Sequence, residues 1–137
     1  MKRLALALAA LAVAATPALA EGDAKKGEKT FKKCKSCHSI ANGDDVIVKG
    51  GKTGPNLYGV IGRKAGSAEG YKYSSAMVAA GEAGLVWDEE KLATFVKDPS
   101  AFLKEVTGDA AAKSKMTFKL KKGGEDVAAY LASLAAE

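Results

Sequence analysis

Cys34-Lys35-Ser36-Cys37-His38 decides how this chain folds, because the pentapeptide holds both of its cysteines and its single histidine. The stretch follows the C-x-x-C-H pattern. Residues i and i+3 of a helical turn share a face, so Cys34 and Cys37 can reach the same edge of a flat macrocycle. The pattern is that of c-type haem attachment, with two thioether links and His38 as an axial ligand of the iron.

Three other chemistries use cysteines at this spacing. A disulfide suits an oxidising compartment but leaves His38 and the glycine-rich stretch after it without a reason. A zinc site needs four nitrogen or sulfur ligands, and the chain offers three in one cluster and none elsewhere. A thioredoxin-like redox pair is expected beside a βαβ pattern, which the sequence lacks. We therefore favour haem, which would also fill the core of a small domain with few large apolar residues.

The first twenty residues have the pattern of a secretory signal peptide. Lys2 and Arg3 precede an apolar run from residue 4 to residue 15, and Ala18-Leu19-Ala20 is a small-residue cleavage site. The run is shorter than the roughly 18 to 20 residues of a membrane span, so we expect cleavage and no stable membrane insertion. Residues 21–137 then form one exported domain.

The charge of the chain argues against nucleic-acid binding. The chain has 21 Lys and Arg against 16 Asp and Glu, and loss of Lys2 and Arg3 would leave 19 against 16, or +3. This charge is small, and no basic groove with interleaved aromatic residues is present. The lysines form two clusters that would ring a shared site with positive charge. They are Lys32, Lys33 and Lys35, and Lys113, Lys115, Lys119, Lys121 and Lys122.

The remaining pattern predicts an all-α fold with much loop. Asp23 is placed to cap a helix from Ala24 that carries Gly27, Phe31 and Cys34 along one face. Eight glycines from residue 40 to residue 70 indicate a long loop around a ligand, with one weak strand pattern at 45–49.

Four more helices are predicted beyond this loop. One begins after Ser74 or Ser75 and runs through residue 80, Asp88 caps a second that ends at residue 97, and Pro99 opens a third that covers 100–106. The clearest follows Gly123-Gly124, where apolar residues keep the i, i+3, i+4, i+7 spacing of a core-facing stripe. They are Val127, Tyr130, Leu131 and Leu134.

A haem iron bound by His38 needs a sixth ligand or stays open to exogenous molecules. The chain has no second histidine or further cysteine, so the candidates are methionine, lysine or water, and Met77 and Met116 are the methionines outside the signal. Met77 lies in an apolar helical string, which is typical of packing. No helical stripe explains Met116 among its polar neighbours, so we favour Met116 as the ligand. A neutral thioether favours ferrous iron and raises the reduction potential.

Arg63, the single arginine outside the signal, lies inside the glycine-rich loop. Its planar, permanently charged guanidinium suits a carboxylate, and the obvious carboxylate is a haem propionate. Tyr73 and Trp87 have ring donors for the second propionate, but both equally suit a hydrophobic core, and spacing alone does not decide between these roles.

The chain resembles class I c-type cytochromes, in particular the periplasmic cytochrome c2 group of purple bacteria. The resemblance rests on the pentapeptide, the loop Thr53-Gly54-Pro55-Asn56-Leu57-Tyr58-Gly59, Trp87 and Lys115-Met116, and covers residue 22 to the final helix. It implies a small single domain of short helices and long loops wrapped around one covalently attached haem.

The resemblance also implies roles for individual residues. The Pro55 carbonyl would accept a hydrogen bond from His38, and Phe118 would shield the haem edge. Arg63, Tyr73 and Trp87 would contact the propionates. Many relatives have a tyrosine eight residues after the tryptophan, where this chain has Phe95, and residues 105–112 resemble an insertion.

The function implied by the resemblance is that of a periplasmic one-electron carrier, monomeric and not an enzyme. It would take electrons from a cytochrome bc complex and pass them to a photosynthetic reaction centre or terminal oxidase, docking through lysines around the haem edge. The alternative is a haem enzyme or gas sensor with a displaceable sixth ligand. The lack of a distal histidine or acid–base pair argues against it.

Overall fold

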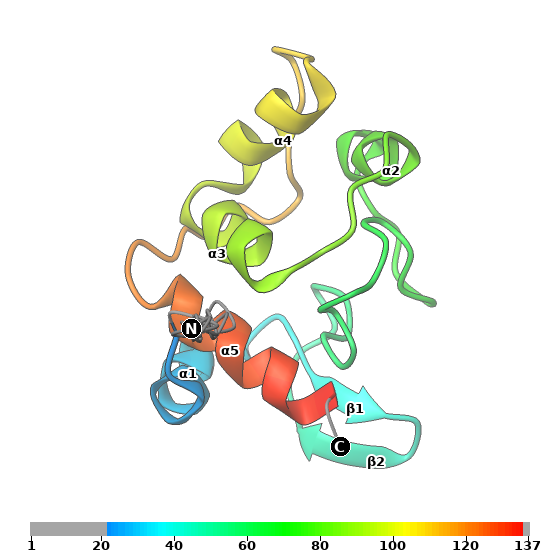
Figure 1. Ribbon diagram of the computed structural model, residues 1–137. Helices are drawn as coiled ribbons and strands as arrows, with labels where there is room; N and C mark the ends of the chain where they lie inside the picture. Colours follow the sequence, from blue (N-terminus) through cyan, green and yellow to red (C-terminus); the bar gives the residue numbers. More distant parts are fainter. Residues whose placement is uncertain (1–21, 136–137) are drawn as a thin grey trace, which may run out of the picture.

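Five short helices and one small hairpin form the regular structure of residues 22–135, the part of the chain that the computed structural model describes (Figure 1). The predicted signal peptide, residues 1–20, lies outside the described residues. The elements are α1 (Ala24–Thr30), the 3-10 turn η1 (Phe31–Lys33), β1 (Ile40–Asn42), β2 (Asp45–Val48), α2 (Ser75–Glu82), α3 (Glu89–Lys97), α4 (Pro99–Thr107) and α5 (Gly124–Ala135). None of the helices described in this range has the length and apolarity of a membrane span.

Side-chain caps set the starts of four helices. Asp23, Ser74 and Asp88 each accept a hydrogen bond from a backbone N–H in the first turn of α1, α2 and α3, as predicted. Asp98 does the same for α4, whose first residue is Pro99, where the missing N–H costs nothing. These caps explain why the predicted helix starts are confirmed to within a residue or two.

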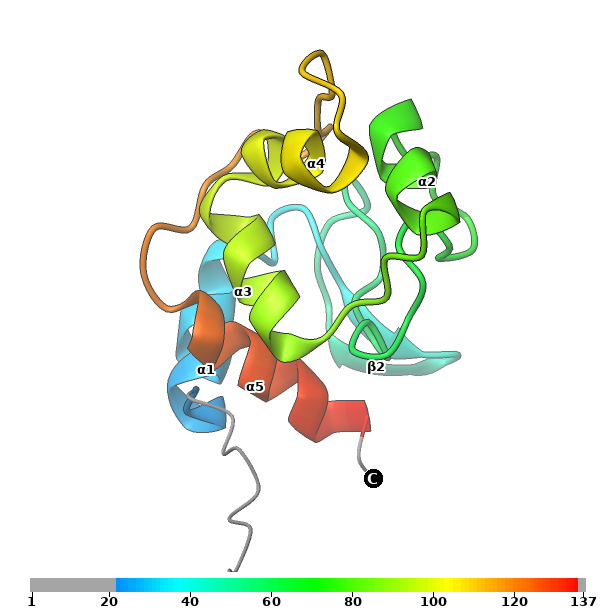
Figure 2. The same ribbon diagram turned by 45° about the horizontal axis from the view of Figure 1, so that its top comes forward.

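α1 packs against α5, so the first and last helices of the described chain lie side by side (Figures 1 and 2). Gly27 is buried at the crossing, where an added Cβ would overlap the Asp126 carbonyl and lie 2.7 Å from Cβ of Tyr130. Phe31 follows on the same face, and its ring centroid lies 5.9 Å from that of Tyr130. The close approach that Gly27 permits holds η1, and hence the C-x-x-C-H turn, against α5.

The hairpin of β1 and β2 is a correction to the expectation of continuous loop from residue 40. The two strands are antiparallel, with Ile40 opposite Val48, and Gly43 has a φ of +60° in the turn between them. The weak strand pattern at 45–49 is confirmed as β2. A three-residue partner such as β1 is too short to show alternation. Residues 49–74 have no helix or strand beyond a bridge residue at Lys64, as the loop prediction requires.

Three aromatic rings join α3, α4 and the segment before them. Trp87 lies 5.1 Å from Phe95 and 5.6 Å from Phe102 between ring centroids, and all three side chains are buried. Phe95, the residue that departs from the family pattern, therefore packs in an aromatic cluster. With α5 and the 49–74 loop, this cluster encloses a central cavity.

We expect Gly27→Ala to lower the free energy of unfolding by about 1–3 kcal/mol, because the new methyl group would force α1 away from α5. Alanine in a free helix interior would instead stabilise by roughly 0.5–1 kcal/mol, so the sign of the change is diagnostic. Denaturant unfolding measures it, with Lys26→Ala on the exposed side of α1 as the control. A stabilised Gly27→Ala protein would contradict this packing.

Candidate functional site

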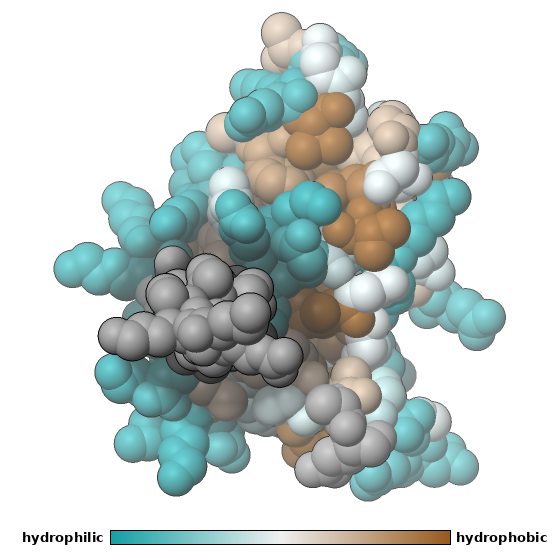
Figure 3. Space-filling model, viewed as in Figure 1, coloured by the Kyte–Doolittle hydropathy of each residue, from teal (hydrophilic) through white to brown (hydrophobic). Residues whose placement is uncertain are grey.

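A single cavity gathers almost every predicted site residue. It contains about 1140 Å³ of space not filled by protein atoms, part of it open to solvent. In Figure 3 apolar surface runs along the middle of the face, between the positions of α4 and α2 in Figure 1, with hydrophilic side chains on either side. The predicted residues that line the cavity are Cys37, His38, Pro55, Arg63, Tyr73, Trp87, Met116 and Phe118. Cys34 is partly buried beside it and is not part of the lining.

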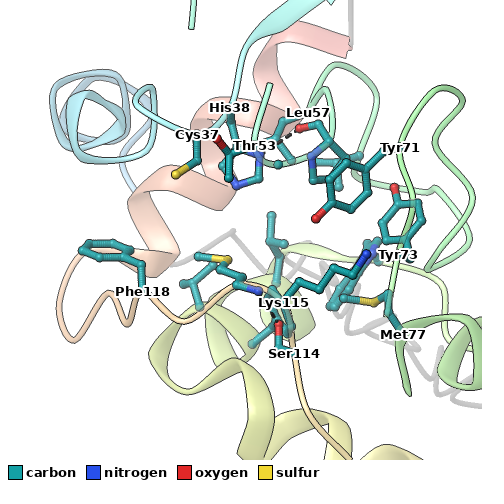
Figure 4. Close-up of a pocket in the computed structure, with 18 of the residues that line it drawn as sticks. Cys37, His38, Thr53, Leu57, Tyr71, Tyr73, Met77, Ser114, Lys115 and Phe118 are labelled. Atoms are coloured by element: carbon teal, nitrogen blue, oxygen red, sulfur yellow. Dashed lines mark hydrogen bonds between the residues drawn. The ribbon is translucent and has the colours of Figure 1, made fainter. Parts of the chain in front are cut away.

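His38 is held in one orientation by the loop that follows it. Its Nδ1 lies 2.8 Å from the Pro55 carbonyl oxygen, so Nδ1 carries the proton and donates. The Gly54 backbone packs against the ring so closely that a Cβ there would lie 2.7 Å from Nδ1. Nε2 is then the free lone pair, and Figure 4 shows the ring directed into the cavity.

Burial lowers the pKa of His38, although the hydrogen bond to Pro55 acts in the opposite direction. Only 8% of the residue's surface is exposed. The imidazole is therefore neutral near pH 7, which is the form that binds a metal ion through Nε2.

Cys34 and Cys37 lie on the turn after η1, as the spacing predicts. The backbone N–H groups of Cys37 and His38 both donate to the Cys34 carbonyl, at 3.1 and 3.0 Å, which places the two thiols one helical turn apart. Both are free thiols and not a disulfide. Burial, with a smaller contribution from Cys37, raises the pKa of the Cys34 thiol to about 11. Both thiols are available for thioether links.

Two methionines reach the cavity wall. Met116 is half-buried on the segment between α4 and α5. Met77 packs in the core from α2, as predicted, but it also lines the cavity, which the sequence pattern did not indicate. Figure 4 places Met77 beyond Tyr73, on the side of the cavity away from His38. Both methionines could thus face His38 across the cavity, and the helical setting of Met77 in α2 favours Met116 as the partner.

The Arg63 guanidinium lines the cavity, and no carboxylate among the described residues pairs with it. Its guanidinium donates to the carbonyl oxygens of Asn56 at 3.0 Å and Tyr58 at 3.4 Å, and no ion pair among residues 22–135 involves it. Burial lowers the pKa of Arg63, but a guanidinium keeps its proton at neutral pH. A half-buried cation of this kind fits an anionic group inside the cavity.

The three aromatic site residues have different surroundings. Tyr73 accepts a hydrogen bond from the backbone N–H of Ala68 at 3.1 Å, which leaves its hydroxyl proton free to donate. Trp87 is 5% exposed and belongs both to the aromatic cluster and to the cavity lining. Phe118 is 45% exposed and lies at the cavity's edge, far from Tyr73 (Figure 4).

Sequence reasoning missed a contact across the cavity mouth. Lys115 Nζ donates to the Lys72 carbonyl oxygen at 2.5 Å and lies 5.9 Å from the ring centroid of Tyr71. Figure 4 shows the Lys115 side chain extended in this direction. The adjacency of Lys115 to Met116 is the only signal in the sequence, and it does not identify the partner. One lysine of the predicted ring is thus already engaged within the molecule.

These residues fit a haem. The cavity offers a neutral imidazole, a thioether, two nearby thiols, an unpaired cation and mostly apolar walls. His38 and Met116 would hold the iron, Cys34 and Cys37 the porphyrin edge, and Arg63 a propionate.

Comparisons with known proteins point to one family. The family model for cytochrome c matches residues 24–135. Cytochrome c2 of Rhodobacter capsulatus is 61% identical over 96% of this chain and 96% of its own length, and cytochrome c-551 of Roseobacter denitrificans is 55% identical over 98% and 96%. The solved structure of the R. capsulatus protein superposes with a TM-score of 0.80, at 63% identity, over 82% of this chain and 98% of that one.

We expect Gly54→Ala to displace the His38 ring, because the added methyl group has no room beside it. The bond to Pro55 would lengthen, and the haem-bearing protein would lose about 1–3 kcal/mol of stability in denaturant unfolding. Lys52→Ala, an exposed change on the same loop, is the control. Equal stability of the two variants would mean that the loop does not fix the imidazole.

Proposed function

The chain belongs to the cytochrome c family, among its class I members of the cytochrome c2 type, and on this premise we propose that it is a one-electron carrier whose iron lies between His38 and Met116. Haem c is its cofactor, attached covalently through Cys34 and Cys37 of the C-x-x-C-H pentapeptide. The haem supplies the one-electron change between ferric and ferrous iron.

One observation carries the proposal: a neutral imidazole and a thioether, distant in sequence, line the same apolar cavity. His38 and Met116 would together fill both axial positions of the iron, which would leave no position for a substrate and little to reorganise on electron transfer. The thioether favours the ferrous state. The Arg63 guanidinium, which lines the cavity, would keep its positive charge in both states.

The same lining argues against the alternative of a haem enzyme. It contains no Asp or Glu and no second histidine, so it offers no pair of groups to move protons onto a bound peroxide. Enzymes that activate ligands at haem iron need such groups or an open coordination position. We therefore propose that the protein is not an enzyme.

The partners we propose are membrane redox complexes with acidic docking surfaces. Phe118 is exposed at the edge of the cavity. Exposed lysines that form no ion pair within the described residues include Lys33, Lys35 and Lys113. Such lysines steer an acidic partner and release it quickly. The donor would be a cytochrome bc complex and the acceptor a photosynthetic reaction centre or terminal oxidase.

The proposed location is the periplasm. The pattern of residues 1–20 supports cleavage by signal peptidase, which would release residues 21–137 as a monomeric domain. Haem attachment is compatible with export, because two thioether links would leave neither Cys34 nor Cys37 free to form a disulfide.

The ligand assignment is tested by comparing two methionine variants. Met116→Leu should abolish the sulfur-to-iron charge-transfer absorption of the ferric protein and lower the reduction potential on the order of 0.1 V, since the thioether is lost. Met77→Leu, the same change at the other methionine of the lining, should keep the absorption band. The reverse pattern would assign Met77 as the ligand, and a spectrum and potential unchanged in both variants would refute a carrier with a methionine ligand.

The docking proposal predicts a salt dependence. Electron transfer between the purified protein and an isolated membrane fraction should slow as ionic strength rises from 0.01 to 0.5 M, as the Debye length contracts from about 30 Å to a few ångströms. Charge reversal in Lys33→Glu should slow the rate at low salt, whereas Lys91→Glu, at an exposed position of α3, should change it little. Rates that do not change with salt would refute docking through the lysines around the haem edge.

A further inference from the structure

The segment that carries Met116 has almost no backbone support of its own. Buried Ala112 and Leu120 mark its two ends, and residues 113–119 between them form neither helix nor strand. No backbone–backbone hydrogen bond within the described part of the chain involves residues 113–119. The conformation that presents Met116 to the cavity must therefore come from side chains.

Two serine hydroxyls fix this conformation, each by accepting one backbone hydrogen bond. Ser100 Oγ accepts a hydrogen bond from the Ser114 backbone N–H at 3.0 Å. Ser114 Oγ in turn accepts from the Met116 backbone N–H, also at 3.0 Å. Both bonds are partly buried, where a lost partner costs more than it does at the surface. The backbone of Met116 is thus linked through Ser114 to the side chain of Ser100.

Ser100 is a firm attachment point. It lies in the first turn of α4, directly after Pro99, and that turn is capped by Asp98, which accepts from the Ala101 N–H at 3.1 Å. One turn further on, Leu103 is completely buried. A hydroxyl held on such a helix end has little freedom to follow a moving loop.

The other end of the segment is tied to the same corner of the fold. Lys119 Nζ lies 3.3 Å from the Asp98 carboxylate, and the Leu120 N–H donates to the Val96 carbonyl at 2.7 Å. The junction of α3 and α4 therefore holds both sides of Met116. Of these contacts, the Ser100 bond is the one made before Met116 in the chain, at Ser114.

We propose that Ser100 is a positioning residue that holds Met116 against the iron. This inference rests on the proposed function, in which Met116 is the axial ligand. The Ser100 hydroxyl does not line the cavity; it acts through Ser114. Its removal should free the segment to swing outward, so that an external ligand competes more easily with the thioether.

The experiment titrates the ferric, haem-bearing protein with imidazole and follows loss of the sulfur-to-iron absorption band. One hydrogen bond of about 1 kcal/mol corresponds to an apparent imidazole affinity roughly threefold to tenfold higher in Ser100→Ala than in the unmodified protein. Ser133→Ala is the matched control, because its hydroxyl bonds to the Tyr130 carbonyl within α5, away from the segment.

A second pair of variants keeps the test sharp where Ser100→Ala folds poorly. Ser100→Thr retains the hydroxyl and should bind imidazole within about twofold of the unmodified protein, while Ser100→Val has the same shape without it and should bind several-fold tighter. Equal affinities in Thr and Val variants, or in Ser100→Ala and Ser133→Ala, would overturn the proposal.

The failure of this inference is distinct from a failure of the proposed function. An unmodified protein with the sulfur-to-iron band, and serine variants with unchanged imidazole affinity, would refute the role of Ser100 alone. An unmodified protein without that band would refute Met116 as ligand and the Ser100 role with it.

Discussion

The hydrogen bond from the His38 ring to the Pro55 carbonyl is the constraint on which the rest of the structure depends. It fixes the tautomer of the only histidine, turns Nε2 toward the cavity, and ties the C-x-x-C-H turn to the long loop. That turn is held from the other side by η1, which α1 presses against α5 through the contact at Gly27. The first and last helices of the described chain and the 49–74 loop thus together orient the His38 imidazole.

The second face of the site is built differently. Packing and burial fix the orientation of His38. Met116 instead lies on a segment without regular structure, whose conformation depends on side-chain hydrogen bonds to α4 and from Lys115. If both residues bind the iron as proposed, one ligand is rigid and the other is held on a tethered segment. The tethered side would then determine how readily other molecules reach the iron.

Much of this was predictable from the sequence, because the signals are local. Asp23, Ser74 and Asp88 are side-chain caps that act within three residues, and the C-x-x-C-H spacing is itself a helical turn. The β1 strand was not predictable, since three residues show no period. The partners of Ser100 and Lys115 are distant in the chain, and their contacts arise only when α4 and the 69–73 loop are brought into place. Met77 shows the same limit, because its helical setting does not reveal that it also faces the cavity.

A crystal structure of the haem-bearing ferric protein tests the central claim most directly. We expect His38 Nε2 and the Met116 sulfur to bind on opposite faces of the iron, with Cys34 and Cys37 in thioether links and Met77 away from the metal. Water, a lysine nitrogen or the Met77 sulfur in the sixth position would contradict it.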